Sequence, residues 1–317
     1  MARKIWLGLA VALVVAIALG AANYKSIILF LVGNLGKQEI AANQEIIWDR
    51  GPAQAVGGDR PPNVIVILAD DLGINDISTF GGGIAGGLVQ TPNIDALAAR
   101  GANLTQAYAG QATCAPSRAM IMTGRYATRH GFEFTPTPDG MSRILEMFYN
   151  DGSRPHPMLR DAEAAKNTPP MAEQGLPGSE ITLAEVLKAR GYHTVHIGKW
   201  HLGDTKEFSA NAQGFDESLL MASGLYLPED DPNVVNAKVD FDPIDKFLWA
   251  RMQAAAKFNG GPMFAPRGYL TDYYTEESVK VIEANRNRPF LLYLAHWGVH
   301  TPLQATRADY DALPQIK

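Results

Sequence analysis

The sequence predicts an α/β domain built on a large, mostly parallel sheet flanked by helices. Residues 64–68 are a continuous apolar run, as expected for a parallel strand that is covered on both faces, and residues 288–294 indicate another buried strand. Residues 192–197 alternate in the manner of a strand. Helical segments lie between these three strands, and this alternation is typical of a parallel α/β sheet.

The helical segments carry their own boundary signals. Thr91-Pro92 opens a short helix whose apolar residues share one face, and Gly101 ends it. Thr182 and Glu185 have the spacing of a capping box, which starts a helix that ends at Arg190-Gly191.

A further helix is expected over residues 272–285. Two long stretches, 135–179 and 204–268, are rich in Pro, Gly, Asp and Met and interrupt the alternation. Such segments in a compact domain are usually functional loops, so we expect them to be irregular and to shape a substrate opening.

Composition excludes several classes. The net charge is −5 over 317 residues, so no nucleic-acid partner is expected. Hydrophobic residues make up 46% of the chain, enough for a sizeable core. The single cysteine excludes an intramolecular disulfide framework.

The N-terminus predicts export. A basic start, Arg3-Lys4, precedes uncharged and mostly apolar residues 5–22, which read as a signal peptide or a membrane anchor rather than a buried soluble helix. A second apolar run, 26–33, is too short to span a bilayer and is expected at an interface. The expected location is periplasmic or otherwise extracytoplasmic, with membrane anchoring and leader cleavage left open.

The sequence predicts that the chain consists of three segments. Residues 1–22 form the signal peptide or anchor, residues 23–62 hold the second apolar patch and a linker, and residues 63–317 form the catalytic domain. The linker is expected over 34–61, which are polar and irregular.

Cys114 is the most informative residue. Pro116 suits the first turn of a helix, which places Cys114 beside a helix N-terminus where negative charge is favoured. Arg118 adds a fixed cation one turn away, a layout that serves a reactive, anion-handling cysteine. The alternative is an inert core cysteine. Arg125, two helical turns past Arg118, is expected to brace this segment.

Polar residues follow each predicted strand. Asp70-Asp71 comes after the first strand, at the sheet edge where α/β proteins bind ligands. Adjacent carboxylates repel each other unless a cation compensates, so they predict a hard metal ion; the alternative is a solvated turn. Lys199 and His201 follow the second strand and His300 follows the third. An ammonium suits an anionic oxygen of a ligand, and a histidine can donate a proton.

These motifs resemble those of the type I, formylglycine-dependent sulfatases, arylsulfatase-like members of the alkaline phosphatase superfamily. The resemblance rests on Cys-x-Pro-Ser-Arg at 114–118 with Met-Thr-Gly at 122–124, on Gly-Lys-Trp-His-Leu-Gly at 198–203 and on His-x-Pro-Leu-Gln at 300–304. It covers residues 63–304 and implies an alkaline-phosphatase-like sulfatase fold.

The resemblance implies the chemistry as well. A formylglycine-generating enzyme would oxidise Cys114, and the formylglycine hydrate would be the nucleophile. Asp70, Asp71 and the Cys114 side chain would bind Ca²⁺, with Mg²⁺ as the alternative. Arg118 and Lys199 would stabilise charge, and His201 or His300 would protonate the leaving oxygen. The substrate would be a sulfated small molecule or a sulfated glycan.

The sequence departs from the family at its C-terminal side. It contains no Asp-Asn-Gly segment, and Asp70, Asp71 and Cys114 give about three ligand groups where Ca²⁺ prefers six to eight. The C-terminal part of the fold is therefore expected to be missing, leaving a weakly active or inactive fragment. Two alternatives stay open: a phosphonate or phosphate monoester hydrolase of the same superfamily, and an inactive fragment that binds sulfated ligands.

Overall fold

The structure is a computed structural model that describes residues 2–55, 58–138, 140–205, 207–239 and 241–314. The chain forms two compact units, which are described separately. The first contains residues 1–39, 139–168 and 238–252, and the second contains residues 40–138, 169–237 and 253–317.

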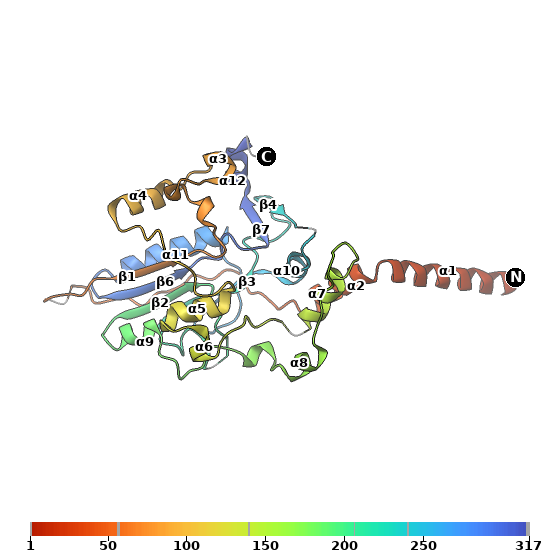
Figure 1. The fold of residues 1–317 in the computed structure, drawn as a ribbon, viewed down its shortest axis with the longest axis horizontal. Coiled ribbons are helices and arrows are strands. Elements are labelled where there is room, and N and C mark those ends of the chain that lie inside the picture. The colour runs from red at the N-terminus through yellow and green to blue at the C-terminus, as the bar shows by residue number, and fades with distance from the viewer. Residues whose placement is uncertain (1, 56–57, 139, 206, 240, 315–317) are drawn as a thin grey trace. The chain divides into compact units, whose positions relative to one another are not determined.

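The second unit is built on a five-stranded sheet (Figure 1). In spatial order the strands are β1 (Val64–Leu68), β6 (Phe290–Ala295), β2 (His193–Gly198), β3 (Glu217–Gly224) and β5 (Ala254–Phe258). The first four strands are parallel, and β5 is antiparallel to β3. The predicted mostly parallel α/β sheet is confirmed.

The prediction that residues 204–268 are irregular is wrong. This stretch contains β3 and β5, which extend the central sheet, and β4 (Val234–Ala237), which pairs with β7 (Leu303–Thr306). The sequences of β3 and β5 are rich in Ala, Ser, Gly and Lys, which have weak strand preference, so pairing within the sheet decides their conformation.

Helices cover both faces of the sheet. Figure 1 shows α11 (Leu270–Ala284) on one side, and α5 (Cys114–Thr123) and α9 (Leu183–Lys188) on the other. The predicted capping box of α9 is confirmed: Thr182 Oγ1 accepts from the Glu185 N–H at 3.2 Å, and the Glu185 carboxylate accepts from the Thr182 N–H at 2.7 Å.

The remaining elements of this unit are short. They are η1 (Ile74–Asp76), η2 (Ser78–Phe80), α3 (Ile84–Gly87), α4 (Pro92–Arg100), α6 (Ala127–His130), η3 (Met171–Glu173) and α12 (Arg307–Ala312). The predicted helix that opens at Thr91-Pro92 is α4.

The strands differ in how well they are covered. Every residue of β2 and β6 is buried, as the apolar run of β6 predicts. On β1, the side chains of Ile65 and Ile67 are 46% and 64% exposed. The expectation that β1 is covered on both faces is therefore wrong, because the face that carries Ile65 and Ile67 is open to solvent.

Part of the expected linker packs on the sheet unit. Ile46 and Trp48 are buried, and Trp48 Nε1 donates to Glu277 Oε2 on α11 at 2.8 Å. The Asp49 N–H donates to Glu217 Oε1 at 2.9 Å. Residues 40–53 thus form part of the same compact unit as the sheet.

The first unit consists of α1 (Ala2–Ala22), α2 (Tyr24–Leu35), α7 (Met141–Tyr149), α8 (Ala162–Asn167) and α10 (Pro243–Arg251). Val32 of α2 packs with Phe247 and Leu248 of α10 in a small core. Gly33 allows this close approach, because a Cβ there would lie 2.4 Å from the Ala250 carbonyl oxygen.

Neither α1 nor α2 alone is long and apolar enough over its described residues to cross a bilayer. Leu13–Ala22 and Tyr24–Leu35 meet those requirements only when taken together, as a pair bent by 77°.

Candidate functional site

Cys114 is the first residue of α5, and Thr113 is the N-cap. The helix begins two residues before Pro116, which lies in the first turn where its missing N–H leaves no bond unmade. Ala115 and Ala119 are buried on the sheet side of α5. Cys114 and Arg118 are four residues apart, so their side chains lie next to each other on one face of this helix.

Asp70 lies just past the end of β1 and is 5% exposed. Its N–H donates to the Gly298 carbonyl at 2.9 Å, and its carbonyl accepts from the Val299 N–H at 2.8 Å. These two bonds join the end of β1 to the loop that follows β6 and carries His300.

Gly198 brings the end of β2 against β6. Its φ is +106°, and a Cβ at this position would lie 2.0 Å from the Ala295 carbonyl oxygen. The following residue, Lys199, donates its N–H to that carbonyl at 2.8 Å. Only glycine permits this approach, which directs the Lys199 side chain toward Asp70.

Arg118, Lys199 and Asp70 form a buried ionic cluster. Arg118 Nη2 donates to Asp70 Oδ1 at 3.0 Å, and Lys199 Nζ donates to Asp70 Oδ2 at 2.5 Å. Arg118 Nη1 also donates to the Lys199 carbonyl at 2.9 Å. All three side chains are at most 6% exposed.

Two cations share one carboxylate in this cluster, so the three side chains carry a net charge of +1. Burial acts to raise the pKa of Asp70, but the adjacent Lys199 and Arg118 charges outweigh burial and hold that pKa below its usual value. Burial lowers the pKa of Lys199 despite Asp70. An anion bound beside the cluster would balance the surplus positive charge.

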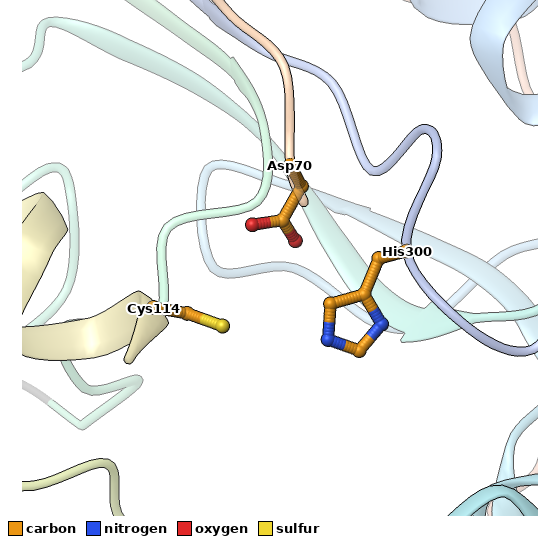
Figure 2. Close-up of side chains that lie close together, drawn as sticks. All are labelled: Asp70, Cys114 and His300. Atoms are coloured by element: carbon orange, nitrogen blue, oxygen red, sulfur yellow. The ribbon is translucent and has the colours of Figure 1, made fainter. Parts of the chain in front are cut away.

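His300 completes the group beside Cys114. Figure 2 shows the side chains of Asp70, Cys114 and His300 converging from three segments, and one donor atom from each lies within 4.8 Å of the others. His300 Nδ1 donates to the Thr301 carbonyl at 2.5 Å, and the ring stacks on Trp297 with centroids 3.8 Å apart. This arrangement fixes the ring and directs Nε2 toward the group.

The pKa of His300 is lowered by burial first and by the charge of Lys199 second. Its Nε2 lies 3.6 Å from Asp71 Oδ2. Asp71 differs from Asp70: its side chain is 58% exposed and its φ is +58°. Asp71 therefore lies at the rim of the site, while Asp70 lies at its base.

His201 is held as a neutral imidazole. Burial, together with the charges of Lys199 and Arg118, lowers its pKa to about 3. Its φ is +62°, and its buried Nδ1 has no hydrogen-bond partner among the described residues. A neutral ring with an unpaired nitrogen can bind one polar group of a ligand.

The donor atoms fit part of a divalent metal site. Asp70 and Asp71 supply hard carboxylate oxygens, which Ca²⁺ and Mg²⁺ prefer. The cluster of Asp70, Cys114 and His300 adds one sulfur and one nitrogen, which suit softer ions. An oxygen in place of the Cys114 sulfur would make position 114 suitable for a hard cation as well.

A cleft of about 830 Å³ opens over Cys114 and Arg118. Its walls come from residues 68–72 and 107–114 and from seven residues of the segment 117–126, and they include the largely exposed Tyr108 and Tyr126. Among the described residues, neither 135–179 nor 204–268 lines this cleft, and the expectation that those stretches shape the substrate opening stays a prediction.

Sequence reasoning missed the wall residues Tyr108 and Gln111. The only available signal was their position within seven residues before Cys114. Arg125 does line the cleft, but α5 ends at Thr123 and Arg125 Nη1 pairs with Glu180 Oε2 at 2.7 Å. Arg125 therefore does not brace Cys114 as expected.

Comparisons with known proteins place the chain in one family. A protein-family model described as Sulfatase matches residues 62–313. N-acetylgalactosamine-6-sulfatase of Mus musculus is 31% identical over 259 residues, which cover 80% of this chain and 42% of the relative. Arylsulfatase J of Mus musculus is 30% identical over 264 residues, which cover 81% of this chain and 36% of the relative.

A solved structure gives the same result. The crystal structure of Ps i-CgsB aligns with a TM-score of 0.60 at 30% identity and covers 81% of this chain and 49% of that one. The complex of Ps i-CgsB with k-i-k-neocarrahexaose aligns with a TM-score of 0.59. The chain spans less than half the length of each of these relatives.

Proposed function

Because the chain belongs to the sulfatase family, we propose that its site hydrolyses sulfate monoesters, with position 114 carrying the nucleophile. The observation that carries this proposal is the buried cluster of Arg118, Lys199 and Asp70, whose surplus positive charge lies beside Cys114 at a helix N-terminus. Negative charge on sulfate oxygens gains most from preorganised cations and N–H groups in such a site.

Cys114 is the residue that a formylglycine-generating enzyme would modify. Formylglycine at this position would supply, as its hydrate, a hydroxyl nucleophile for sulfur and a second hydroxyl that allows release of the sulfate. Asp70 and Asp71, with the oxygen at position 114, would hold Ca²⁺ or Mg²⁺, which supplies further positive charge for the sulfate oxygens.

Four side chains of this chain would stabilise charge and donate a proton. Arg118 is held by two hydrogen bonds and acts as a fixed cation. Lys199 Nζ lies between Asp70 and the face of the Trp297 ring, 4.3 Å from its centroid, so a bound sulfate oxygen can compete with Asp70 for it. His201 and His300 are the remaining donors for the leaving oxygen.

The substrate class that we propose is a sulfated sugar. Two relatives point this way: the murine enzyme is named for N-acetylgalactosamine-6-sulfate, and Ps i-CgsB has been solved with an oligosaccharide. The exposed rings of Tyr108 and Tyr126 at the cleft wall are suited to pack against a pyranose face.

We also propose export, because the basic start and the apolar residues 5–22 have the pattern of a leader or an anchor. The catalytic site would then be periplasmic or extracytoplasmic.

The test of the proposed function compares three aryl esters with protein purified from its native host. We expect turnover of the aryl sulfate to exceed that of the aryl phosphate and the aryl phosphonate. A preference for the phosphate or phosphonate would replace the proposal with the hydrolase of the same superfamily. Binding of sulfated oligosaccharide without turnover of any ester would leave a binding protein.

A further inference from the structure

Helix α2 is apolar on two opposite faces. One face carries Val32 and Gly33 and packs against α10 and α7. The opposite face carries an exposed stripe at helical spacing, formed by Tyr24 (48% exposed), Ile27 (44%), Phe30 (68%), Leu31 (46%) and Leu35 (84%). A helix that is apolar all round needs cover on every side, and the described residues of its unit leave this stripe bare.

The bare stripe continues into α1. The described large side chains of α1 are also exposed, among them Trp6 (71%), Leu13 (62%) and Ile17 (62%). The two helices meet at a bend of 77°. Such a bend allows α2 to lie along a bilayer surface while α1 enters the bilayer, because an interfacial helix runs in the membrane plane.

Basic residues gather around the C-terminal end of α7, which Lys25 of the first turn of α2 also contacts. Lys25 Nζ and Lys246 Nζ lie 5.6 and 5.7 Å from the centroid of the Phe148 ring, and the Arg154 guanidinium lies 4.1 Å from the centroid of Tyr149. Asp151, whose carboxylate feels the charges of Arg154 and Lys25, offsets part of this positive charge. Lys and Arg beside aromatic rings form the typical composition of a membrane interface.

The two units also differ in net charge. The unit that contains α2 holds eleven Lys and Arg against nine Asp and Glu, a net charge of +2, whereas the whole chain carries −5. The remaining residues therefore carry −7. An anionic lipid surface attracts the first unit and repels the second.

We propose that α2, packed on α7 and α10, is an interfacial membrane helix whose stripe of Tyr24, Ile27, Phe30, Leu31 and Leu35 lies in the headgroup–acyl boundary of an anionic bilayer. Lys25 and Lys246 then lie at the level of the lipid phosphates. Segments 139–168 and 238–252, which supply α7 and α10, form the support that holds α2 in this orientation. This inference does not depend on the proposed catalytic activity.

The test uses the full 317-residue chain with a single introduced thiol. The C114S/L31C variant is labelled with an environment-sensitive fluorophore and added to vesicles of phosphatidylcholine and phosphatidylglycerol. The matched control is C114S/I47C, because Ile47 is an 83% exposed apolar residue of the other unit. We expect a blue shift and quenching by a shallow lipid-borne nitroxide for L31C, and neither for I47C.

Two outcomes would overturn the proposal. A water-like spectrum for labelled L31C on chain that floats with the vesicles would show that the stripe stays outside the bilayer. A blue shift without lipid that grows with protein concentration would assign the stripe to a second copy of the chain. The K25E/K246E pair in the labelled background should reduce the dependence on phosphatidylglycerol severalfold, and an unchanged dependence would remove the anionic lipid from the proposal.

Discussion

The two ends of the central sheet both hold buried charge, and they balance it in opposite ways. At the carboxyl end, the buried side chains of Arg118 and Lys199 share Asp70, so this buried trio carries a net charge of +1, while Asp71 lies exposed at the rim. At the amino end, His193 Nε2 bonds to Glu217 Oε2 at 2.8 Å, and Lys188 Nζ pairs with Asp216 Oδ1 at 2.7 Å. Two carboxylates there meet one lysine, so negative charge is in excess.

The two ends of the sheet also differ in whether their buried nitrogen atoms have hydrogen-bond partners among the described residues. Arg118 Nε and His201 Nδ1, at the carboxyl end, are buried without a partner among the described residues, whereas the His193 nitrogens at the amino end both face carboxylates. A buried network with its bonds satisfied stabilises a fold, while one with surplus charge and unpaired atoms is prepared for a ligand. This contrast separates the candidate site from a structural network of similar composition.

The largest expected difference in the free energy of unfolding is between substitutions of two buried carboxylates, Asp70 and Glu217. In D70N, Arg118 and Lys199 would face a neutral amide in a buried position, so we expect the free energy of unfolding to fall by about 3–5 kcal/mol. The matched variant E217Q keeps an oxygen for the Asp49 N–H and should lose about 1 kcal/mol. Chemical denaturation measures both, and equal losses would erase the distinction between the two ends.

Substitutions of Lys199 and Lys188 should distinguish a catalytic role from a structural one. K199M removes a buried cation beside Cys114, and we expect kcat/KM for an aryl sulfate to fall about 10²–10³-fold. K188M breaks a half-exposed pair at the amino end and should leave kcat/KM unchanged. Steady-state kinetics on both variants decides the point; a comparable fall in K188M would contradict the assignment of the site to the carboxyl end.

His196 lies on β2 between the two ends, and burial lowers its pKa from 6.5 to about 3. Between these pH values, His196 is protonated in the unfolded chain but stays neutral in the folded chain. This residue should therefore reduce the free energy of unfolding by up to about 1.4 kcal/mol per pH unit as the pH falls from 6.5 toward 3.

H196Q should flatten this acid-side slope, measured by denaturation at a series of pH values. The exposed H156Q serves as the control and should keep the slope of the parent protein. If H196Q and the parent lose stability in parallel, burial of this ring is not the cause.

The smallest effect is expected at Asp216. Burial acts to raise its pKa, but hydrogen bonds from Lys188 and Thr194 outweigh burial and hold the pKa below 3.8. Its contribution is therefore present above pH 3.8 and is lost as the pH falls through the lower folded pKa. D216N should cost about 0.5–1 kcal/mol at neutral pH, because the pair with Lys188 is partly exposed. A cost that stays constant down to strongly acidic pH would argue against an ionic contribution.

Much of the fold and the site could be predicted because the signals were local. The apolar run of β6 and the capping box at Thr182 specify their elements without distant partners. Cys114, Lys199 and His300 lie in motifs next to predicted elements, and parallel strands bring such positions to one edge. The structure accordingly brings Asp70, Cys114, Arg118, Lys199 and His300 together.

The features that the sequence did not predict depend on distant contacts. Strands β3 and β5 have weak intrinsic preference and form by pairing with their neighbours. Trp48 lies in a segment that looks like a linker, yet it is buried because Glu277, 229 residues away, accepts its indole N–H. The exposure of Ile65 and Ile67 on one face of β1 likewise depends on what packs against that face, which the apolar sequence of the strand does not reveal.

The most direct test of the central claim measures turnover against the chemical state of position 114. Preparations from a host with graded levels of formylglycine-generating enzyme would be assayed with an aryl sulfate, and the aldehyde fraction in the Cys114 peptide would be measured by mass spectrometry. We expect turnover in direct proportion to that fraction, with none in C114A. Turnover that is independent of the aldehyde fraction, or retained in C114A, would contradict the assignment of the nucleophile to Cys114.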